Sequence, residues 1–225
     1  MPRNFIPSRY LVGSFSVILV TAVALAYGAS HAVLPAPATD ISTSTTTGKQ
    51  TAVFSGGCFW GMEAVFEHLK GVSSVVSGYS SGSAVTASYE VVSSGTTGHA
   101  ESIKVTYDPS QISYEQLLKV YFLVAHDPTE LNRQGPDAGT QYRSAIFFAN
   151  DAQKSIAQAY IDQLNKAHTF PKPIVTQLVP LKSFYAAEGY HQHFIDLHPD
   201  NPYVVVNDLP KLRSLRQQFP NIYKN

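Results

Sequence analysis

The single cysteine of this 225-residue chain, Cys58, lies in Gly56-Gly57-Cys58-Phe59-Trp60-Gly61, between two apolar patterns of different period. Before it, residues 51–54 are typical of a short buried strand. After it, apolar side chains recur with helical spacing at Met62, Val65, Phe66 and Leu69. The pattern predicts Cys58 at the N-terminus of a helix, in a fold that has no intramolecular disulfide.

This position suits a reactive thiol. A helix N-terminus offers unsatisfied backbone N–H groups and the positive end of the helix dipole, and both stabilise a thiolate. We therefore expect a lowered pKa for Cys58. Gly57 lets a substrate approach the backbone closely, and Phe59 and Trp60 supply apolar walls beside the sulfur. The alternative is that Cys58 is a small apolar side chain of the core.

The charge balance argues against a polyanionic partner. Lysine plus arginine and aspartate plus glutamate each number 16, and neither a basic stripe nor an acidic block occurs. We therefore expect no binding to nucleic acid.

The first fifty residues are interpreted as a targeting segment and a linker. Arg3 and Arg9 precede an apolar stretch over residues 11–27, and Ser30-His31-Ala32 offers a possible cleavage site. Residues 1–32 are thus a signal peptide or an uncleaved membrane anchor, because the stretch approaches the lower limit for a spanning helix. Residues 33–50, rich in Pro, Ala, Ser and Thr, are typical of a flexible linker. We expect an exported protein, periplasmic or membrane-anchored and facing away from the cytoplasm.

Strand and helix patterns alternate through residues 51–225, a length that suits one domain. Ser113-Tyr114-Glu115-Gln116 is typical of a helix-initiating capping box, and Asn150 is expected to cap a second helix. The order strand–helix–strand–strand–helix–strand predicts an α/β protein of the α+β type, a two-layer sandwich with a ferredoxin-like βαββαβ core and extra helices. Beyond residue 184 we expect a short helix and then an extended, proline-containing C-terminal tail. The strands are expected at residues 51–54, 72–79, 102–107, 144–149 and 174–180.

Two further segments carry candidate chemistry. Glu101, in Thr97-Gly98-His99-Ala100-Glu101, precedes an alternating strand, so it could be held at a sheet end facing an apolar pocket. Such a pocket would raise its pKa and make it a proton donor; the alternative is a solvated glutamate. Asp137 and Tyr142 end a long irregular segment, residues 126–142, where Tyr142 could offer its O–H to a substrate oxygen. The alternative is a turn with a tyrosine packed on the core.

The histidines of Tyr190-His191-Gln192-His193, with His198, raise the question of a zinc site that includes Cys58. A Cys58–His191 nucleophile–base pair is also conceivable. Neither an HExxH nor a CxxC motif is present, and no orienting third group is evident. We therefore expect hydrogen-bonded histidines and no metal.

Four motifs together resemble the A-type peptide methionine sulfoxide reductases, and the resemblance covers about residues 51–212. It implies that Cys58 attacks the sulfoxide sulfur and that Phe59 and Trp60, beside Gly57, bind the substrate's methyl group. It further implies that Glu101 protonates the sulfoxide oxygen. Tyr89 and Tyr142 would hydrogen-bond to that oxygen, and Asp137 would organise the polar side. The substrate implied is the S epimer, in proteins or as the free amino acid, with no bound cofactor. The motifs are Gly57-Cys58-Phe59-Trp60-Gly61, Thr97-Gly98-His99-Ala100-Glu101, Asp137-Ala138-Gly139-Thr140-Gln141-Tyr142-Arg143-Ser144 and Tyr190-His191-Gln192.

Two features set this chain apart from many relatives. Residues 200–225 hold no recycling cysteine, so a Cys58 sulfenic acid would need an external thiol: a thioredoxin-like or glutaredoxin-like protein, or a small thiol. The loop before Tyr89 contains Gly78-Tyr79-Ser80-Ser81-Gly82, where the family usually has a glycine pair, and it lacks the usual proline before Tyr89.

The partners expected are therefore oxidised proteins and peptides and a thiol reductant, together with a membrane if the N-terminal segment is an anchor, and the enzyme itself is expected to be a monomer. Two other functions stay open. A thiol redox sensor would need neither Glu101 nor Tyr142, whereas a cysteine–histidine hydrolase would depend on His191.

Overall fold

The computed structural model describes residues 48–225. The predicted targeting segment, residues 1–32, and most of the predicted linker, residues 33–50, lie outside the described residues. In the part of the chain that is described, we find no helix with the length and apolar character needed to cross a membrane.

A six-stranded sheet organises the fold, in the order β7-β6-β1-β3-β2-β8. The β6–β7 pair is parallel and the other neighbours are antiparallel. The four strands β6-β1-β3-β2 have the order of a ferredoxin-like core, so the predicted α+β class is confirmed. The strands are β1 (Gln50–Ser55), β2 (Val72–Ser80), β3 (Ala100–Tyr107), β6 (Ala145–Phe148), β7 (Gln177–Pro180) and β8 (Phe184–Ala186).

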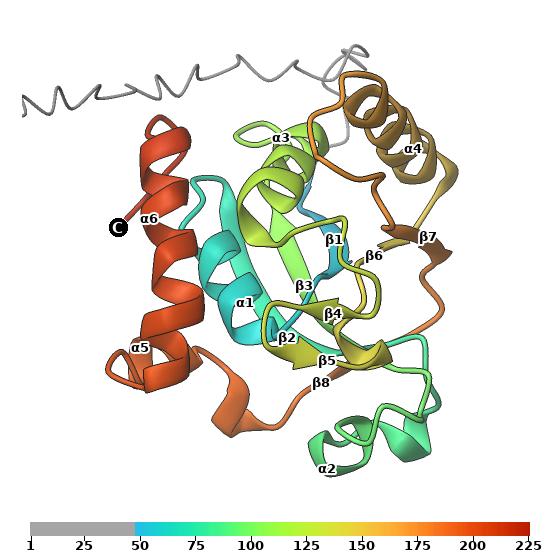
Figure 1. The fold of residues 1–225 in the computed structure, drawn as a ribbon. Helices are drawn as coiled ribbons and strands as arrows, with labels where there is room; N and C mark the ends of the chain where they lie inside the picture. The colour runs from blue at the N-terminus through green and yellow to red at the C-terminus, as the bar shows by residue number, and fades with distance from the viewer. Residues whose placement is uncertain (1–47) are drawn as a thin grey trace, which may run out of the picture. The chain divides into compact units, whose positions relative to one another are not determined.

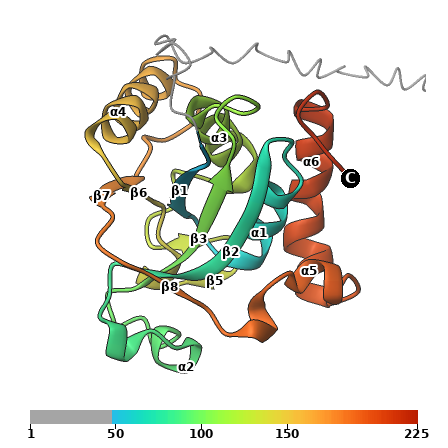
Figure 2. The same cartoon turned by 180° about the vertical axis from the view of Figure 1, so that it is seen from behind.

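Helices α1 (Phe59–Glu67) and α3 (Tyr114–Val120) lie on one face of this sheet, in front of it in Figure 1 and behind it in Figure 2. The main core lies between these layers. Phe54 of β1 is fully buried and stacks on Phe66 of α1 at 5.4 Å and on Tyr121 at 5.0 Å between ring centroids. Burying side chains of this size stabilises a fold by about 1.5–3 kcal/mol each.

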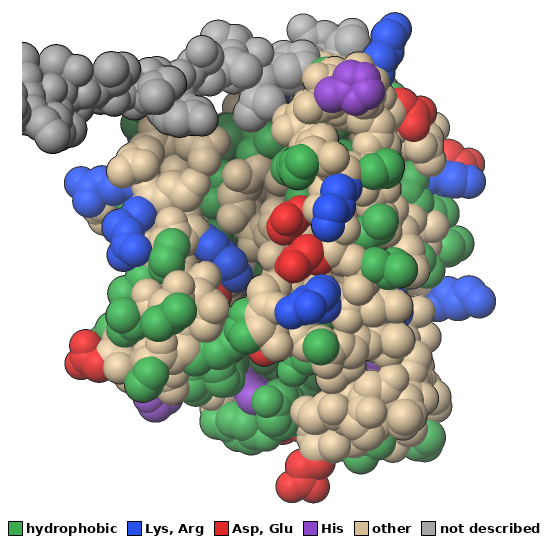
Figure 3. All heavy atoms as spheres, in the orientation of Figure 1, with side chains coloured by type: hydrophobic (Ala, Val, Ile, Leu, Met, Phe, Trp, Pro, Cys, Tyr) green, Lys and Arg blue, Asp and Glu red, His purple; other side chains and the backbone are tan. Residues whose placement is uncertain are grey.

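The opposite face of the sheet carries a smaller apolar cluster. Because side chains alternate along a strand, Val53 points away from the face that Phe54 occupies. Val53 packs there with Phe147 and with Phe184 of the edge strand β8. On the face shown in Figure 3, basic and acidic side chains are mixed rather than gathered by sign.

Both predicted helix caps are present. Ser113 and Gln116 form the reciprocal capping box at the start of α3, with N···O distances of 2.9 and 3.2 Å. The Asn150 side chain accepts the Gln153 N–H at 2.9 Å and caps α4 (Asp151–Lys166). Local sequence signals therefore set these helix starts.

The prediction of an extended C-terminal tail is wrong. After α5 (Phe194–Leu197), a π-helical turn (Val204–Asp208) leads into α6 (Leu209–Gln218), which packs against α1. Pro210 lies in the first turn of α6, where a backbone N–H has no partner within the helix, so the proline does not interrupt it. The tail is therefore structured over the helix that carries the cysteine motif.

The loop around Tyr89 and the segment predicted to be irregular, residues 126–142, contain short elements. Residues 80–97 include the 3-10 turn η1 (Ala84–Thr86) and α2 (Tyr89–Val92). Residues 126–142 include a two-stranded hairpin, β4 (Arg133–Gln134) and β5 (Asp137–Ala138), followed by η3 (Thr140–Tyr142). These elements place tyrosines that the sequence analysis singled out.

Candidate active site

Cys58 is the N-cap residue of α1, directly after β1, as the sequence predicted. It is 9% exposed. Gly57 precedes it with a φ of +92°, and its N–H donates to the Tyr142 carbonyl oxygen at 3.2 Å. A Cβ at Gly57 would lie 2.6 Å from Cγ of Gln134. The glycine is therefore required for both its backbone conformation and the close approach of the β4–η3 segment.

Glu101 lies beside the start of α1 because of the strand register. The antiparallel pairing sets Phe54 of β1 opposite Ile103 of β3, so Glu101 is level with the residues that lead to Cys58. Glu101 is 2% exposed, and its Oε2 accepts the Phe59 N–H at 3.1 Å. The carboxyl group is thus bonded to the peptide that follows the cysteine.

The pKa of Glu101 is raised to about 8. Burial is the main cause, the charge of Asp137 adds to it, and the hydrogen bond from Phe59 opposes it. At neutral pH the carboxyl group therefore carries its proton. The pKa direction expected from the sequence is confirmed.

The pKa of Cys58 is raised, which corrects the prediction of a lowered value. Burial is the largest cause, followed by the charges of Glu101 and Asp208. The Trp60 backbone N–H and the Lys211 ammonium group act in the opposite direction. The helix terminus does favour the thiolate, but removal of the sulfur from water outweighs it, so the resting side chain is a thiol.

Tyr89 and Tyr142 lie near the same two groups. The phenol pKa of each is raised, chiefly by burial and next by the charge of Glu101, with Cys58 also contributing. Tyr89 begins α2, and its N–H donates to Oε1 of Glu188 at 2.9 Å. Both phenols stay protonated and can donate a hydrogen bond, and both side chains are only partly buried, so a ligand can contact them.

Asp137 belongs to β5 and accepts a short hydrogen bond from the Tyr203 hydroxyl group. Its charge reaches Glu101 and Tyr142, since it contributes to the raised pKa of both. Tyr203 also meets Trp60 edge-to-face, with ring centroids 5.9 Å apart. A residue from the C-terminal region therefore joins the polar and apolar sides of the site.

The two aromatic residues after Cys58 differ in exposure. Phe59 is 1% exposed and packs against Tyr79 and His191. Trp60 is half-buried and stacks on Phe194, with ring centroids 3.6 Å apart and an interplanar angle of 6°. Trp60 is thus the larger accessible apolar surface beside the cysteine.

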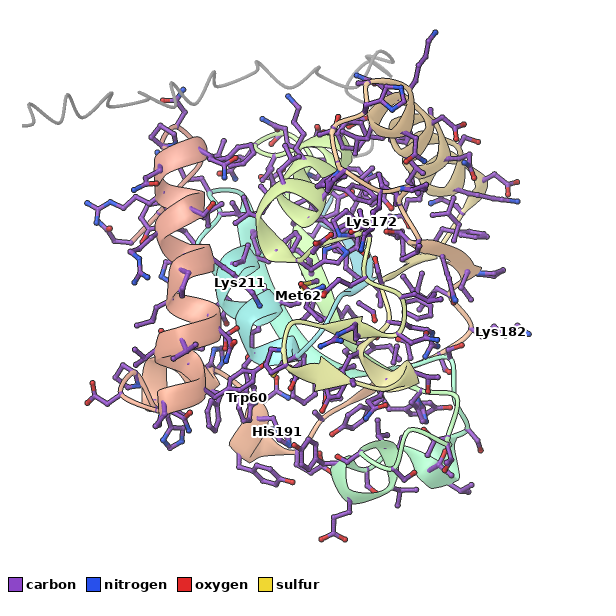
Figure 4. The ribbon with its side chains drawn as sticks, viewed as in Figure 1. Trp60, Met62, Lys172, Lys182, His191 and Lys211 are labelled. Atoms are coloured by element: carbon purple, nitrogen blue, oxygen red, sulfur yellow. The ribbon has the colours of Figure 1, made fainter. Side chains whose placement is uncertain are left out.

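His191 holds the Trp60 indole. Its Nδ1 accepts the indole N–H at 3.1 Å, and Figure 4 shows the two side chains next to each other below α1. Burial lowers the pKa of His191, so the ring is neutral. Among the described residues no hydrogen bond joins it to Cys58. Its position matches the expected hydrogen-bonded histidine rather than a catalytic base.

Arg143 connects two of the sequence motifs. Its guanidinium group donates to the carbonyl oxygens of Gly98 and His99, each at 3.0 Å. The loop that leads into Glu101 is therefore fastened to the segment that ends in Tyr142.

Sequence reasoning missed one buried ion pair in the site. Asp208 is fully buried, and its Oδ1 accepts from Nζ of Lys211 at 3.1 Å. A Cβ at Gly61 would lie 2.1 Å from that oxygen, so the last glycine of the cysteine motif makes room for the pair. Figure 4 shows Lys211 between α6 and α1. The i, i+3 spacing of Asp208 and Lys211 would have signalled the pair, had this tail been interpreted as helical.

Together these residues define a cysteine-based site in which proton donors surround a buried thiol. The acid, the two phenols and the thiol meet at one end of the sheet, beside an apolar aromatic surface. Such a site suits a substrate that has a reactive atom, an acceptor oxygen and a small apolar group.

Comparison with known proteins identifies the family. Residues 50–222 match the family described as peptide methionine sulfoxide reductase. The chain is 61% identical over 176 residues to peptide methionine sulfoxide reductase MsrA 2 of Mesorhizobium japonicum, covering 78% of this chain and 90% of the relative. It is 54% identical over 194 residues to MsrA 2 of Synechocystis sp., covering 85% and 91%.

Two solved structures have a similar fold. Reduced Mxr1 of Saccharomyces cerevisiae superposes with a TM-score of 0.63 at 34% identity, over 68% of this chain and 87% of that one. Methionine sulfoxide reductase A of Corynebacterium diphtheriae gives 0.60 at 33% identity, over 70% and 78%. The chain belongs to the peptide methionine sulfoxide reductase family, and it is an oxidoreductase that reduces methionine sulfoxide.

Proposed function

We propose that this enzyme reduces the S epimer of methionine sulfoxide, in proteins and as the free amino acid, by attack of the Cys58 sulfur on the sulfoxide sulfur. Glu101 is the proton donor. The observation that carries the proposal is the position of this protonated carboxyl group, bonded to the backbone N–H that immediately follows Cys58.

The step balances as a transfer of one oxygen atom. As the Cys58 sulfur bonds to the substrate sulfur, Glu101 gives its proton to the sulfoxide oxygen, which is a poor leaving group without it. The thiol proton of Cys58 replaces the one that Glu101 has lost. The hydroxyl group then passes from the substrate sulfur to the Cys58 sulfur: the substrate S–O bond and the temporary S–S bond break, and an S–O bond to Cys58 forms. The products are methionine and a Cys58 sulfenic acid. The substrate sulfur gains the two electrons that the cysteine sulfur loses.

The residues around Cys58 and Glu101 support roles in binding the two ends of the sulfoxide group. Tyr89 and Tyr142 donate hydrogen bonds to the sulfoxide oxygen, and Asp137 holds the polar side through Tyr203. Phe59 and Trp60, next to Gly57, contact the methyl group. Exchanging oxygen and methyl, as the R epimer does, would set the oxygen against the indole and the methyl against the phenols, which accounts for selectivity between epimers.

The sulfenic acid is recycled by an external thiol. That thiol displaces water to form a mixed disulfide with Cys58, and a second thiol releases the reduced enzyme. Cys58 is the only cysteine of the chain, which supports this one-cysteine cycle. The reductant is a thioredoxin-like or glutaredoxin-like protein or a small thiol.

The place of action follows from the N-terminal sequence. The basic and apolar pattern of residues 1–32 supports export, as a periplasmic or membrane-anchored protein. We further propose that the enzyme is a monomer. Its substrates would be oxidised proteins and peptides outside the cytoplasm.

The test is a single turnover of the reduced enzyme with separate S and R epimers of a blocked methionine sulfoxide, without reductant. We expect about one methionine per enzyme from the S epimer alone, with Cys58 trapped by a sulfenic-acid probe. Cys58→Ser should release none. Release from both epimers, or release without trapping at Cys58, would refute the proposal. Oxidation of Cys58 by peroxide without any turnover would instead favour the sensor.

A further inference from the structure

A second cluster of polar side chains lies along the second half of α1, outside the candidate active site. Glu63 and Glu67 are one helical turn apart on α1, and His193 faces both. One ligand atom from each of the three residues lies within 4.8 Å of the other two. His193 Nδ1 lies 2.7 Å from Oε1 of Glu67, and the His193 backbone N–H donates to Oε2 of Glu63 at 3.0 Å.

The buried member of this cluster has an unused oxygen. Glu63 is 1% exposed, and its Oε1 has no hydrogen bond within 3.5 Å among the described residues, although the Ser77 hydroxyl group is near enough to act on the carboxyl group. A buried acceptor without a close partner is unfavourable, and more so if it is charged. The carboxyl group is therefore short of one close partner.

The other two members lead to solvent. The Glu67 side chain is 20% exposed and that of His193 is 60% exposed. Both also line a cavity of about 470 Å³ beside β2, together with Gln192 and Lys224. A small ion can thus reach the cluster from solvent at Glu67 and His193.

The donor set indicates the class of ligand. One imidazole nitrogen and two carboxylate oxygens suit zinc and similar transition-metal dications, whereas magnesium and calcium prefer oxygen ligands alone. Zinc bonds of about 2.0–2.2 Å place ligand atoms roughly 3.4 Å apart, which is within the spread of these three atoms. Two carboxylates would also neutralise a dication in a half-buried site.

We propose that Glu63, Glu67 and His193 form a binding site for a zinc-class dication, which fastens the end of α1 to the segment that follows His191. This departs from the expectation that the histidines hold no metal, because the sequence analysis paired His193 with Cys58 and not with the glutamates. The site shares no residue with the candidate active site, and it does not depend on the proposed function. Water completes the coordination on the exposed side.

The experiment is a calorimetric titration of the full chain with ZnCl₂, without a polyhistidine tag and with Cys58→Ser so that the thiol cannot compete. We expect one zinc per chain. In the same background, Glu67→Gln and His193→Asn should each weaken binding at least about tenfold, because even residues behind a ligand commonly cost 10–100-fold. MgCl₂ should give no binding at the same concentrations.

Two matched variants control for side effects. His168→Asn changes another histidine with positive φ, at 49° against 53° for His193, so it tests the effect on the backbone without touching the cluster. Asp196→Asn removes a neighbouring charge that acts on Glu67 but is not a ligand. Both should bind zinc within about threefold of the parent. Circular dichroism identifies any variant that fails to fold, and the remaining variants then decide the result. Zinc binding that is absent, or equally strong in all variants, would overturn the proposal.

Discussion

Glu101 and Glu63 are two buried glutamates in similar settings: Glu101 lies beside the start of α1, and Glu63 lies in its middle. Glu101 is 2% exposed and Glu63 is 1% exposed, and each accepts one backbone N–H, at 3.1 and 3.0 Å respectively. Burial is the main cause of a raised pKa in both, to about 8 and about 7. They differ in what faces them: a thiol and two phenols for Glu101, and a second carboxylate and a histidine for Glu63. A raised pKa alone therefore does not mark a catalytic acid, whereas the neighbouring groups do.

The first test replaces each glutamate in turn by glutamine, which has no acidic proton to donate. Glu101→Gln should lower the single-turnover rate with the S epimer by about 10²–10⁴-fold, because the sulfoxide oxygen then leaves without general-acid catalysis. Glu63→Gln should cost at least tenfold less. Methionine release, followed by rapid quench, measures both. Similar losses in the two variants would show that Glu101 acts through burial and packing rather than as an acid.

The raised pKa of Glu63 should affect the stability of the fold rather than the activity. Its folded pKa of about 7 exceeds the usual value of 4.5, so its contribution to stability is complete below about pH 4.5 and is lost as pH rises through 7. Between pH 5 and pH 8, in metal-free buffer, the free energy of unfolding of the parent should fall by about 1–3 kcal/mol more than that of Glu63→Gln. Urea unfolding at the two pH values tests this. Asp162→Asn, an exposed change on α4, should keep the fall seen in the parent.

The pH dependence of the single-turnover rate tests whether Glu101 acts as the acid. The acid is active in its protonated form, so the single-turnover rate should be level below about pH 8 and fall up to about tenfold per pH unit above it. A reaction limited only by thiolate formation at Cys58 would show the opposite sign. The falling limb should disappear in Glu101→Gln. A rate that rises from pH 8 to 9 in the parent would contradict the assignment.

The smallest effect is expected at His191, which contacts the site only through Trp60 and neighbouring rings. His191→Ala should raise KM several-fold, because the indole loses its hydrogen-bond partner, and should change the rate at saturating substrate less. A cysteine–histidine hydrolase would lose its activity entirely. Steady-state kinetics with the S epimer distinguish the two outcomes.

The sequence predicted the parts of this molecule that depend on neighbouring residues in the chain. The caps at Ser113 and Asn150 and the place of Cys58 before α1 are local signals, and all are confirmed. The order of strand and helix patterns along the chain also predicted the ferredoxin-like core correctly. Glu101 was also found, because its motif directly precedes a well-patterned strand.

The rest depends on contacts between distant residues. The pKa of Cys58 was predicted in the wrong direction because its burial and its approach to Asp208 follow from packing of α6, which prolines had made to resemble an extended tail. The meeting of Glu63 with His193 joins residues 130 positions apart. Periodicity along the chain carries no information about such pairs.

The packing of the C-terminal region over α1 has a consequence for how the site is assembled during folding. Tyr203, Asp208 and Lys211 come from this region, far along the chain from Cys58. Until they pack, Asp137 lacks its hydroxyl partner, Trp60 lacks its edge-to-face neighbour, and the space beside Gly61 is unfilled. The site is therefore complete only after α6 has docked on α1, so the reactivity of Cys58 is coupled to a late tertiary contact rather than to its own helix alone.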